Sequence, residues 1–329
     1  MTTVNRIEIP IPFPIRSVNI YFIQDSITTL IDAGFHLDES FDLVESAISN
    51  AGYRLTDIQR ILLTHGHLDH VGLAGRIAAV SGAEIFIHPL DQDKCIWDIK
   101  RDHAKRMEPF LRFFREAGLS ETVIQDISVI MNARFKEFFP GRFKVQDITS
   151  HGSFSFDDFS LDVIYCPGHT SGSVCFFDRK NGNLFSGDHL LKNITSNAVV
   201  EIEGPDKRNG YKSLSSHLKS LEMISAMGVK SVLPGHGAPF SGHRERIDEI
   251  IRHHHMRREA VLNVLAACDK RETERPGMTL FMISRKLFPY LRGWDIFLGL
   301  SEVHGHLEIL KEEGLVSSCK AGGQRFYRL

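Results

Sequence analysis

Leu62-Leu63-Thr64-His65-Gly66-His67-Leu68-Asp69-His70-Val71-Gly72 places four potential metal ligands within six consecutive residues. The apolar residues before the ligands predict a short buried strand, and the small residues after them have helical spacing. Because His65 and His67 lie two apart on an extended backbone, their side chains point the same way and can bind one ion. Asp69 and His70 lie beyond the turn and can face a second ion. This segment therefore predicts a metal site on a strand-to-helix turn.

Composition places few further limits on the 329-residue chain. Its 42% hydrophobic and 24% charged residues are ordinary for a globular protein, and a net charge of -2 gives no electrostatic reason to expect a nucleic-acid or membrane partner. The 5 cysteines are scattered without a Cys-x-x-Cys pair, which is typical of free thiols in a reducing compartment. Residues 1–14 contain three prolines and no apolar segment. We therefore expect a cytoplasmic protein without a membrane partner.

Short apolar runs and helical patterns alternate through the first part of the chain. Strands are predicted at residues 18–24, 27–32 and 83–88, with a helix at 41–50. This alternation favours an α/β fold in which helices cover sheets.

Three later turns also carry side chains that can bind metal. They contain His169 in Pro-Gly-His-Thr, Asp188 in Ser-Gly-Asp and His236 in Pro-Gly-His-Gly. Each turn follows a short apolar run that predicts a strand. Functional groups at several strand ends indicate a site built on one edge of the sheets.

A helical insert at about residues 90–140 interrupts the α/β pattern. Two helices are predicted, at 91–116 and 121–139, and phenylalanines recur along them at intervals of three or four residues. The rings either fasten a helical hairpin to the body or wall a substrate pocket beneath a cap. Phe113 and Phe114 are the residues assigned to that pocket, and the full set is Phe110, Phe113, Phe114, Phe135, Phe138 and Phe139.

The chain changes character after residue 247. Helices are predicted at 247–268, 280–287 and 296–313, followed by two short strands around Ala321-Gly322-Gly323, an order typical of a winged helix. We place the domain boundary inside the first of these helices, with a catalytic domain at 1–256 and a winged-helix-like domain at 257–329. His253, His254 and His255 lie on that helix, where we expect a solvated or interdomain role.

The four motifs together resemble the metallo-β-lactamase fold hydrolases over about residues 15–255. The resemblance implies an αββα sandwich with its site at one edge, here carrying the helical insert and the small C-terminal domain. It also implies two divalent ions, with zinc expected first and iron or manganese as alternatives. The ligand set is similar to that of glyoxalase II, lactonases and RNase Z. By this resemblance, His65, His67 and His169 bind the first ion, Asp69, His70 and His236 bind the second, and Asp188 bridges them.

Two bound ions can share a hydroxide that is formed at neutral pH, which suits hydrolysis of several bond types. We expect a hydrolase that cleaves an ester, thioester or lactone of a small, partly apolar substrate. Asp69 is expected to orient the nucleophile as well as bind metal, and His189 is a candidate substrate contact.

Two other functions stay open. An endoribonuclease or phosphodiesterase would fit a tail similar to that of β-lactamase-like hydrolases, a group that includes an endoribonuclease. The predicted helix 296–313 argues against it, because it contains four glutamates and one lysine where a phosphate-binding surface needs clustered basic residues. A ligand-sensing regulatory protein is the third function, although such a protein has no chemical need for all seven ligands. The C-terminal domain could instead serve packing or a homodimer contact.

Overall fold

The strand that precedes the histidine segment, β4 (Arg60–Leu62), lies in a six-stranded sheet of the computed structural model. The structure describes residues 2–95, 99–138, 141–196, 198–202, 210–269 and 277–329. β1, β2 and β3 pair antiparallel, whereas β3 to β6 pair parallel. The strands, in sheet order, are β1 (Thr3–Pro10), β2 (Ser17–Gln24), β3 (Thr29–Ile31), β4, β5 (Glu84–Ile87) and β6 (Gln146–Asp147).

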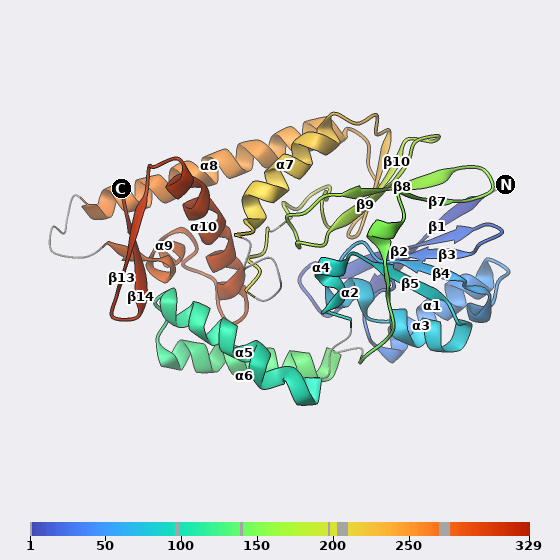
Figure 1. Cartoon of the computed structure of the whole chain (residues 1–329), viewed down its shortest axis with the longest axis horizontal. Coiled ribbons are helices and arrows are strands. Elements are labelled where there is room, and N and C mark those ends of the chain that lie inside the picture. Colours follow the sequence, from blue (N-terminus) through green and yellow to red (C-terminus); the bar gives the residue numbers. More distant parts are fainter. Residues whose placement is uncertain (1, 96–98, 139–140, 197, 203–209, 270–276) are drawn as a thin grey trace.

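A second sheet of five strands faces the first (Figure 1). Its pairs are antiparallel except for β10 and β11, which run parallel. In sheet order the strands are β11 (Ser231–Pro234), β10 (Asn183–Gly187), β9 (Val174–Asp178), β8 (Ser160–Tyr165) and β7 (Ser153–Ser155).

Alternate residues of β2 enter two different cores. Tyr21 and Ile23 join the core between the two sheets, and Ile20 and Phe22 join the core under the helices of the first sheet. This is the expected result of a period of two along a strand with both faces buried. Helices α1 (Asp38–Asn50) and α3 (Ala74–Ser81) cover the first sheet, and α7 (Ser213–Ser225) and the first part of α8 (His243–Asp269) cover the second. The predicted αββα sandwich is therefore confirmed.

Strand β1 differs from the sequence prediction, which treated residues 1–14 as a segment broken by prolines. Thr3–Pro10 instead pairs with β2 along its whole length, with Ile7 and Ile9 buried. Pro10 ends the strand, and β1 lies at the sheet edge, where the missing N–H of a proline costs least.

The insert helices share one hydrophobic core with the C-terminal helices. The insert consists of α5 (Ile99–Glu116) and α6 (Glu121–Phe138), and the short helix α4 (Pro89–Gln92) precedes them. Two helices, α4 and α5, therefore stand where a single helix was predicted at residues 91–116. Residue 139, the predicted end of the second helix, lies outside the described residues. Phe114, Ile127, Val261, Leu300 and Leu310 all belong to this core. In Figure 1, α5 and α6 lie beside the C-terminal unit at the end of the molecule away from the sheets.

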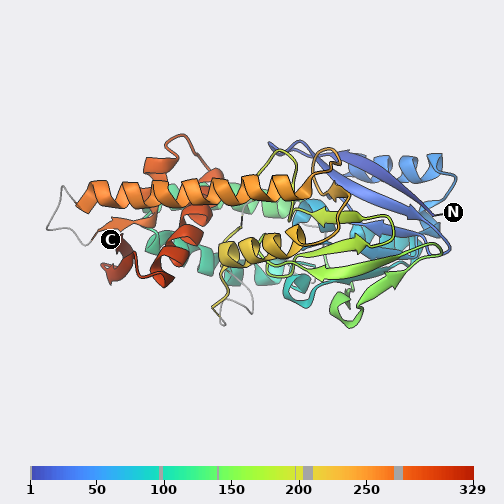
Figure 2. The same cartoon turned by 90° about the horizontal axis from the view of Figure 1, so that it is seen from above.

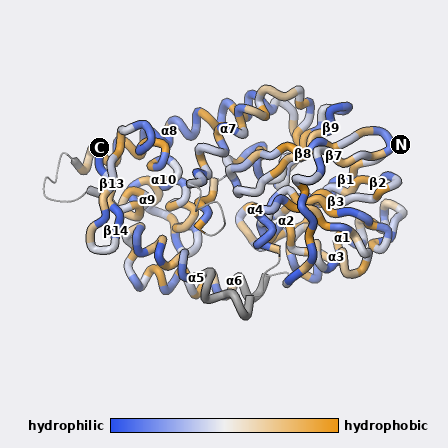
Figure 3. The backbone as a smooth tube through the Cα atoms, viewed as in Figure 1, coloured by the Kyte–Doolittle hydropathy of each residue, from blue (hydrophilic) through white to orange (hydrophobic). Residues whose placement is uncertain are grey.

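The C-terminal unit combines helices with a three-stranded sheet in the order β12-β14-β13, which is compatible with the predicted winged-helix-like unit. The proposed boundary at 256/257 falls inside α8, which Figure 2 shows as one continuous rod from the sandwich to the far end of the molecule. In Figure 3, α8 carries much blue, whereas much of the orange lies along the strands of the two sheets. No helix among the described residues is long and apolar enough to cross a membrane. The other elements are α9 (Leu280–Leu287), α10 (Asp295–Glu312), β12 (Met278–Thr279), β13 (Ser317–Ala321) and β14 (Gln324–Arg328).

Candidate metal centre

The seven predicted ligands lie at one edge of the sandwich because each follows the end of a strand. His65 and His67 lie between β4 and the short helix α2 (Leu68–Val71), which itself carries Asp69 and His70. His169 lies in the loop between β8 and β9. Asp188 and His236 follow β10 and β11, and these two strands are parallel, so their ends meet at the same edge.

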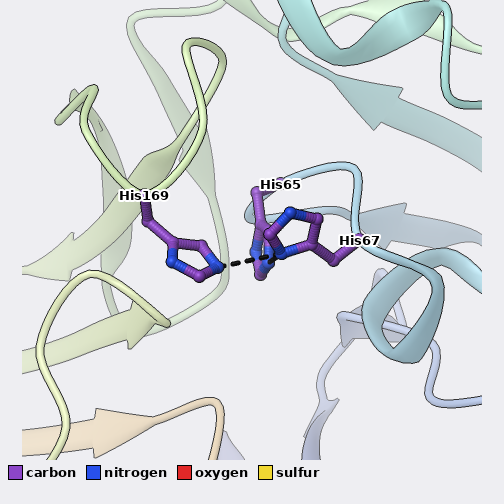
Figure 4. A group of neighbouring side chains, drawn as sticks. All are labelled: His65, His67 and His169. Carbon is purple, nitrogen blue, oxygen red and sulfur yellow. Dashed lines mark hydrogen bonds between the residues drawn. The ribbon is translucent and has the colours of Figure 1, made fainter. Parts of the chain in front are cut away.

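His65, His67 and His169 form the first set of ligands (Figure 4). Nδ1 of His67 lies 3.1 Å from Nε2 of His65 and 2.9 Å from Nε2 of His169. Two ligand nitrogens of a tetrahedral zinc ion, each about 2.1 Å from the metal, are about 3.4 Å apart. The three nitrogens are therefore already placed to bind a single ion.

Asp69, His70 and His236 form the second set. Nε2 of His236 lies 3.4 Å from Oδ2 of Asp69 and 3.2 Å from Oδ2 of Asp188. Nε2 of His70 lies 3.4 Å from Oδ1 of Asp188, while the other oxygen of Asp188 lies 3.5 Å from Nε2 of His169. Asp188 thus faces ligands of both sets, as a bridging carboxylate requires.

The donor atoms fit divalent metal ions. Among the described residues, Nε2 of His70 and Oδ1 of Asp188 are buried and have no hydrogen-bond partner. Buried polar atoms normally have hydrogen bonds, so an imidazole nitrogen and a carboxylate oxygen that face each other without one fit a cation as their shared partner. Imidazole and carboxylate are the donors that zinc and iron accept.

Asp32 positions His70 through the ring nitrogen that faces away from the centre. Its Oδ2 lies 2.7 Å from Nδ1 of His70 and also accepts a hydrogen bond from the Thr64 hydroxyl. Oδ1 of Asp32 accepts the backbone N–H of Thr64 at 2.8 Å. The carboxylate therefore fixes the orientation of the His70 ring and the start of the histidine segment together.

Three other ligands are held in the same way. Nδ1 of His236 lies 2.5 Å from the carbonyl oxygen of Ser17, and Nδ1 of His169 lies 3.0 Å from Oγ of Ser196. Nδ1 of His65 lies 3.0 Å from Oγ1 of Thr64. These contacts leave each Nε2 directed at the centre.

Asp91 connects the two loops that supply the first set of ligands. Its Oδ2 accepts the backbone N–H of Gly66 and the hydroxyl of Thr170, both at 2.7 Å. Its other oxygen accepts from Lys94, which also bonds Glu201 at 3.2 Å. This network fixes the position of the loop that carries His65 relative to the loop that carries His169.

The carboxylates of the centre control the protonation of its histidines. Burial lowers the pKa of His236, but Asp188 and Asp69 oppose it and raise that pKa to about 10. The pKa of His70 is also raised well above its ordinary value by Asp188, Asp32 and Asp69, against the effect of burial. Burial and the neighbouring His169 lower the pKa of His67 to about 3. His65 and His67 are therefore neutral and ready to bind metal, while His70 and His236 carry protons that an ion must displace.

The three residues assigned to a substrate pocket lie in two different places. His189 directly follows Asp188, and its buried ring contacts that of His217, with centroids 4.9 Å apart. Phe113 and Phe114 contact Phe297 of α10, with centroids 6.2 and 6.1 Å apart, within the helical core. The contribution of these three side chains to substrate binding stays a prediction.

Asp32 and Asp91 were missed by the sequence analysis. Asp32 opens Asp-Ala-Gly at the end of a predicted strand, and that acid at a strand end was a signal of the same kind as Asp188. Asp91 lies in the short helix α4 that follows β5, but no spacing in the sequence links it to Gly66 or Thr170.

The fold and the centre define a metallo-hydrolase of the αββα class. The chain belongs to the metallo-beta-lactamase superfamily, whose family model matches residues 14–236. It is similar to "Probable metallo-hydrolase YqjP" of Bacillus subtilis (strain 168), at 28% identity over 100% of this chain and 99% of the relative.

Two further proteins are similar. The metallo-beta-lactamase family protein TTHA1429 from Thermus thermophilus superimposes with a TM-score of 0.80 at 26% identity, covering 99% of this chain and 98% of that structure. "Hydroxyacylglutathione hydrolase GloC" of Haemophilus influenzae is 24% identical over 64% of this chain and 79% of the relative. The predicted family and its hydrolase class are confirmed.

Proposed function

We propose that this hydrolase uses two divalent ions to cleave an ester, thioester or lactone bond of a small, partly apolar substrate. The observation that carries the proposal is the position of Asp188, whose two oxygens lie 3.2–3.5 Å from ligands of both sets. A bridging carboxylate of this kind is the feature expected of a two-ion centre rather than a single structural ion.

The residues divide into two ligand sets. His65, His67 and His169 would hold one ion, and Asp69, His70 and His236 the other, with Asp188 shared. When bound, such ions supply a hydroxide nucleophile at neutral pH and polarise the substrate oxygen. We propose zinc for both positions, because the imidazole-rich first set matches its preference; iron and manganese are the alternatives.

Asp69 and His189 are the side chains proposed to act on the reacting groups. Asp69 carries a carboxylate beside His236, and His70 and His236 keep the pKa of Asp69 at about 2 despite its burial. It is therefore ionised at neutral pH and can accept a hydrogen bond from the attacking water. His189 is neutral, because burial lowers its pKa to about 3, and it can donate to a substrate oxygen without adding charge.

The charge of α10 supports an acyl substrate over a nucleic acid. Glu308 and Glu312 are the more exposed glutamates of this helix, which contains Lys311 as its single lysine, whereas Glu302 is largely buried. Such a helix would repel a phosphate backbone. The similarity to a hydroxyacylglutathione hydrolase supports the thioester among the acyl substrates.

We further propose that residues 257–329 form a winged-helix-like unit used for packing or a homodimer contact. A cytoplasmic location is proposed because Cys95, Cys166, Cys175 and Cys268 form no disulfide, as expected in a reducing compartment.

A hydrolysis screen tests the proposal. Purified protein of measured metal content is offered p-nitrophenyl acyl esters, acyl thioesters and lactones, alongside bis-p-nitrophenyl phosphate and short single-stranded RNA. We expect turnover of acyl substrates that a chelator abolishes, zinc restores and Asp69→Asn weakens. The matched control is His255→Ala, which removes an exposed histidine of α8. Cleavage of the phosphodiesters alone would refute the acyl assignment.

A further inference from the structure

A second cluster of potential metal ligands lies outside the hydrolytic centre, on the helices that join the sandwich to the C-terminal unit. It consists of His254 on α8 with Glu302 and His306 on α10, and one ligand atom from each lies within 4.8 Å of the others. His254 and His306 are buried, at 3% and 1% exposure. None of the three belongs to the motifs that define the superfamily centre.

The local sequence explains how the cluster forms. Glu302 and His306 are four residues apart on α10 and therefore lie on the same face of that helix. His254 approaches them from α8, with its ring centroid 5.5 Å from that of His306. A pair of ligands one helical turn apart, completed by a third from a neighbouring helix, is a common way for helices to bind a metal ion.

The donor atoms of the cluster are buried without hydrogen bonds. In the part of the chain that the structure describes, both ring nitrogens of His254, Nε2 of His306 and Oε1 of Glu302 lack a hydrogen-bond partner. Leaving so many polar atoms unpaired in one place carries a large desolvation cost. A metal ion shared by all three side chains would give a partner to Oε1 of Glu302, Nε2 of His306 and one ring nitrogen of His254, and so remove most of that cost.

The spacing of the donors fits a metal ion better than a direct hydrogen bond. Nε2 of His306 lies 3.7 Å from Oε1 of Glu302, which is too long for a hydrogen bond. Two ligands of a tetrahedral zinc ion are about 3.4 Å apart. A similar spacing occurs in the hydrolytic centre, where Nε2 of His70 lies 3.4 Å from Oδ1 of Asp188.

The charges of the cluster determine which ligand it takes. An anion would meet the carboxylate of Glu302, so the cluster suits a cation. Two imidazoles favour zinc or a similar transition metal over calcium or magnesium, which prefer oxygen donors. Nε of Arg257 lies 3.4 Å from Oε1 of Glu302 and competes for the carboxylate, so this ion is held less tightly than those of the hydrolytic centre.

We propose that His254, Glu302 and His306 bind a third divalent metal ion, with zinc as the best match, between α8 and α10. The ion would stabilise the packing of α7, α8 and α10 against one another, and the region where these three helices meet is called the seam below. A Cβ on Gly305 of α10 would lie 2.8 Å from Cβ of Leu214, so α10 already packs tightly on α7. Figures 1 and 2 both show α8 passing from this seam to the sandwich.

The seam also contacts the segments that carry Asp188 and His169 of the hydrolytic centre. His217 of α7 contacts His189, which follows the bridging Asp188, and its ring centroid lies 6.5 Å from that of His254. Gly168, next to His169, has φ of 148°, and a Cβ there would lie 2.3 Å from Cα of His217. A zinc ion at the seam would thus have a structural function, holding α7 against the loop that carries His169.

Counting bound zinc tests the proposal. Wild type, the double variant His254→Ala/His306→Ala and Glu302→Gln are dialysed to equilibrium against a zinc buffer, and zinc per chain is measured by elemental analysis. We expect each variant to bind about one zinc ion fewer than wild type, as loss of ligands from a mononuclear site requires. His255→Ala is the matched control, because it removes an exposed histidine of the same helix and should leave the count unchanged.

Circular dichroism of each variant shows whether it folds, and Glu302→Gln keeps the shape of the side chain in case the double variant does not. We also expect zinc to raise the Tm of wild type more than that of Glu302→Gln. An equal zinc count in wild type and both folded variants would overturn the proposal. The count does not depend on hydrolysis, so an error in the proposed substrate would leave this test intact.

Discussion

Oδ2 of Asp32 lies 2.7 Å from Nδ1 of His70, and Asp32 adopts a left-handed backbone conformation with φ of 60°. Both side chains are almost fully buried, so this contact excludes water from the far side of the metal ligand. The strained backbone and the buried carboxylate together direct Nε2 of His70 at Asp188.

Asp32→Asn is therefore expected to weaken metal binding without removing a ligand. Asparagine tolerates positive φ and has the same shape, but it lacks the charge that orients and polarises the imidazole. Changes of this kind cost about 10–100-fold in metal affinity. Competition with a chromogenic chelator measures the loss, with the exposed Asp38→Asn as control. Equal affinities of wild type and Asp32→Asn would show that the contact does not tune the metal.

Asp188→Ala should lower both metal content and turnover, because it removes the carboxylate shared by the two ligand sets. The ions contribute several kcal/mol to such a reaction, so we expect turnover to fall by at least about 100-fold. Elemental analysis and the acyl-substrate assay measure the two effects. Unchanged turnover in a folded Asp188→Ala protein would rule out the two-ion interpretation.

The sequence predicted those parts of the centre that are encoded in consecutive residues. His65, His67, Asp69 and His70 could be assigned because a strand-to-helix turn fixes where four neighbouring side chains point. His169, Asp188 and His236 stood out as candidates because each follows an apolar run within a short motif, and the family resemblance supplied their places in the two ligand sets. In both cases, the local sequence was enough to mark candidate ligands.

Interactions between distant segments could not be predicted in this way. The role of Asp32 depends on β3 and β4 being neighbours, and Asp91 reaches Thr170 across 79 positions. The cluster of His254 and His306 depends on α8 packing against α10, so the sequence indicated only a solvated or interdomain helix. Phenylalanine spacing is the same whether a ring faces a substrate or a core, so the position of Phe114 also required the structure.

Zinc binding at pH 7 is expected to release protons. His236 has a pKa of about 10 and is therefore protonated at neutral pH before metal binds, and it must lose that proton to become a ligand. Apparent zinc affinity should consequently rise with pH until about pH 10. Calorimetry in buffers of different ionisation enthalpy measures the number of protons released. Identical binding enthalpies in all buffers would contradict a protonated His236.

Phe114→Ala is expected to act on stability. Its side chain is fully buried in the core shared by the insert and the C-terminal unit. Removing a buried phenylalanine leaves a cavity and costs about 3–5 kcal/mol in free energy of unfolding. Urea denaturation measures the loss, and Val129→Ala, an exposed substitution on α6, provides the control.

Phe113 allows the structural and the pocket interpretations to be separated, because its side chain is only partly buried in the same core. If its ring only joins α5 to Phe297, Phe113→Ala should lower the Tm and leave KM for apolar acyl esters unchanged. We expect this result, since the ring of Phe113 contacts those of Phe114, Phe297 and His304. A higher KM for long-chain esters at an unchanged Tm would instead place the ring in the substrate pocket, with the insert acting as a cap.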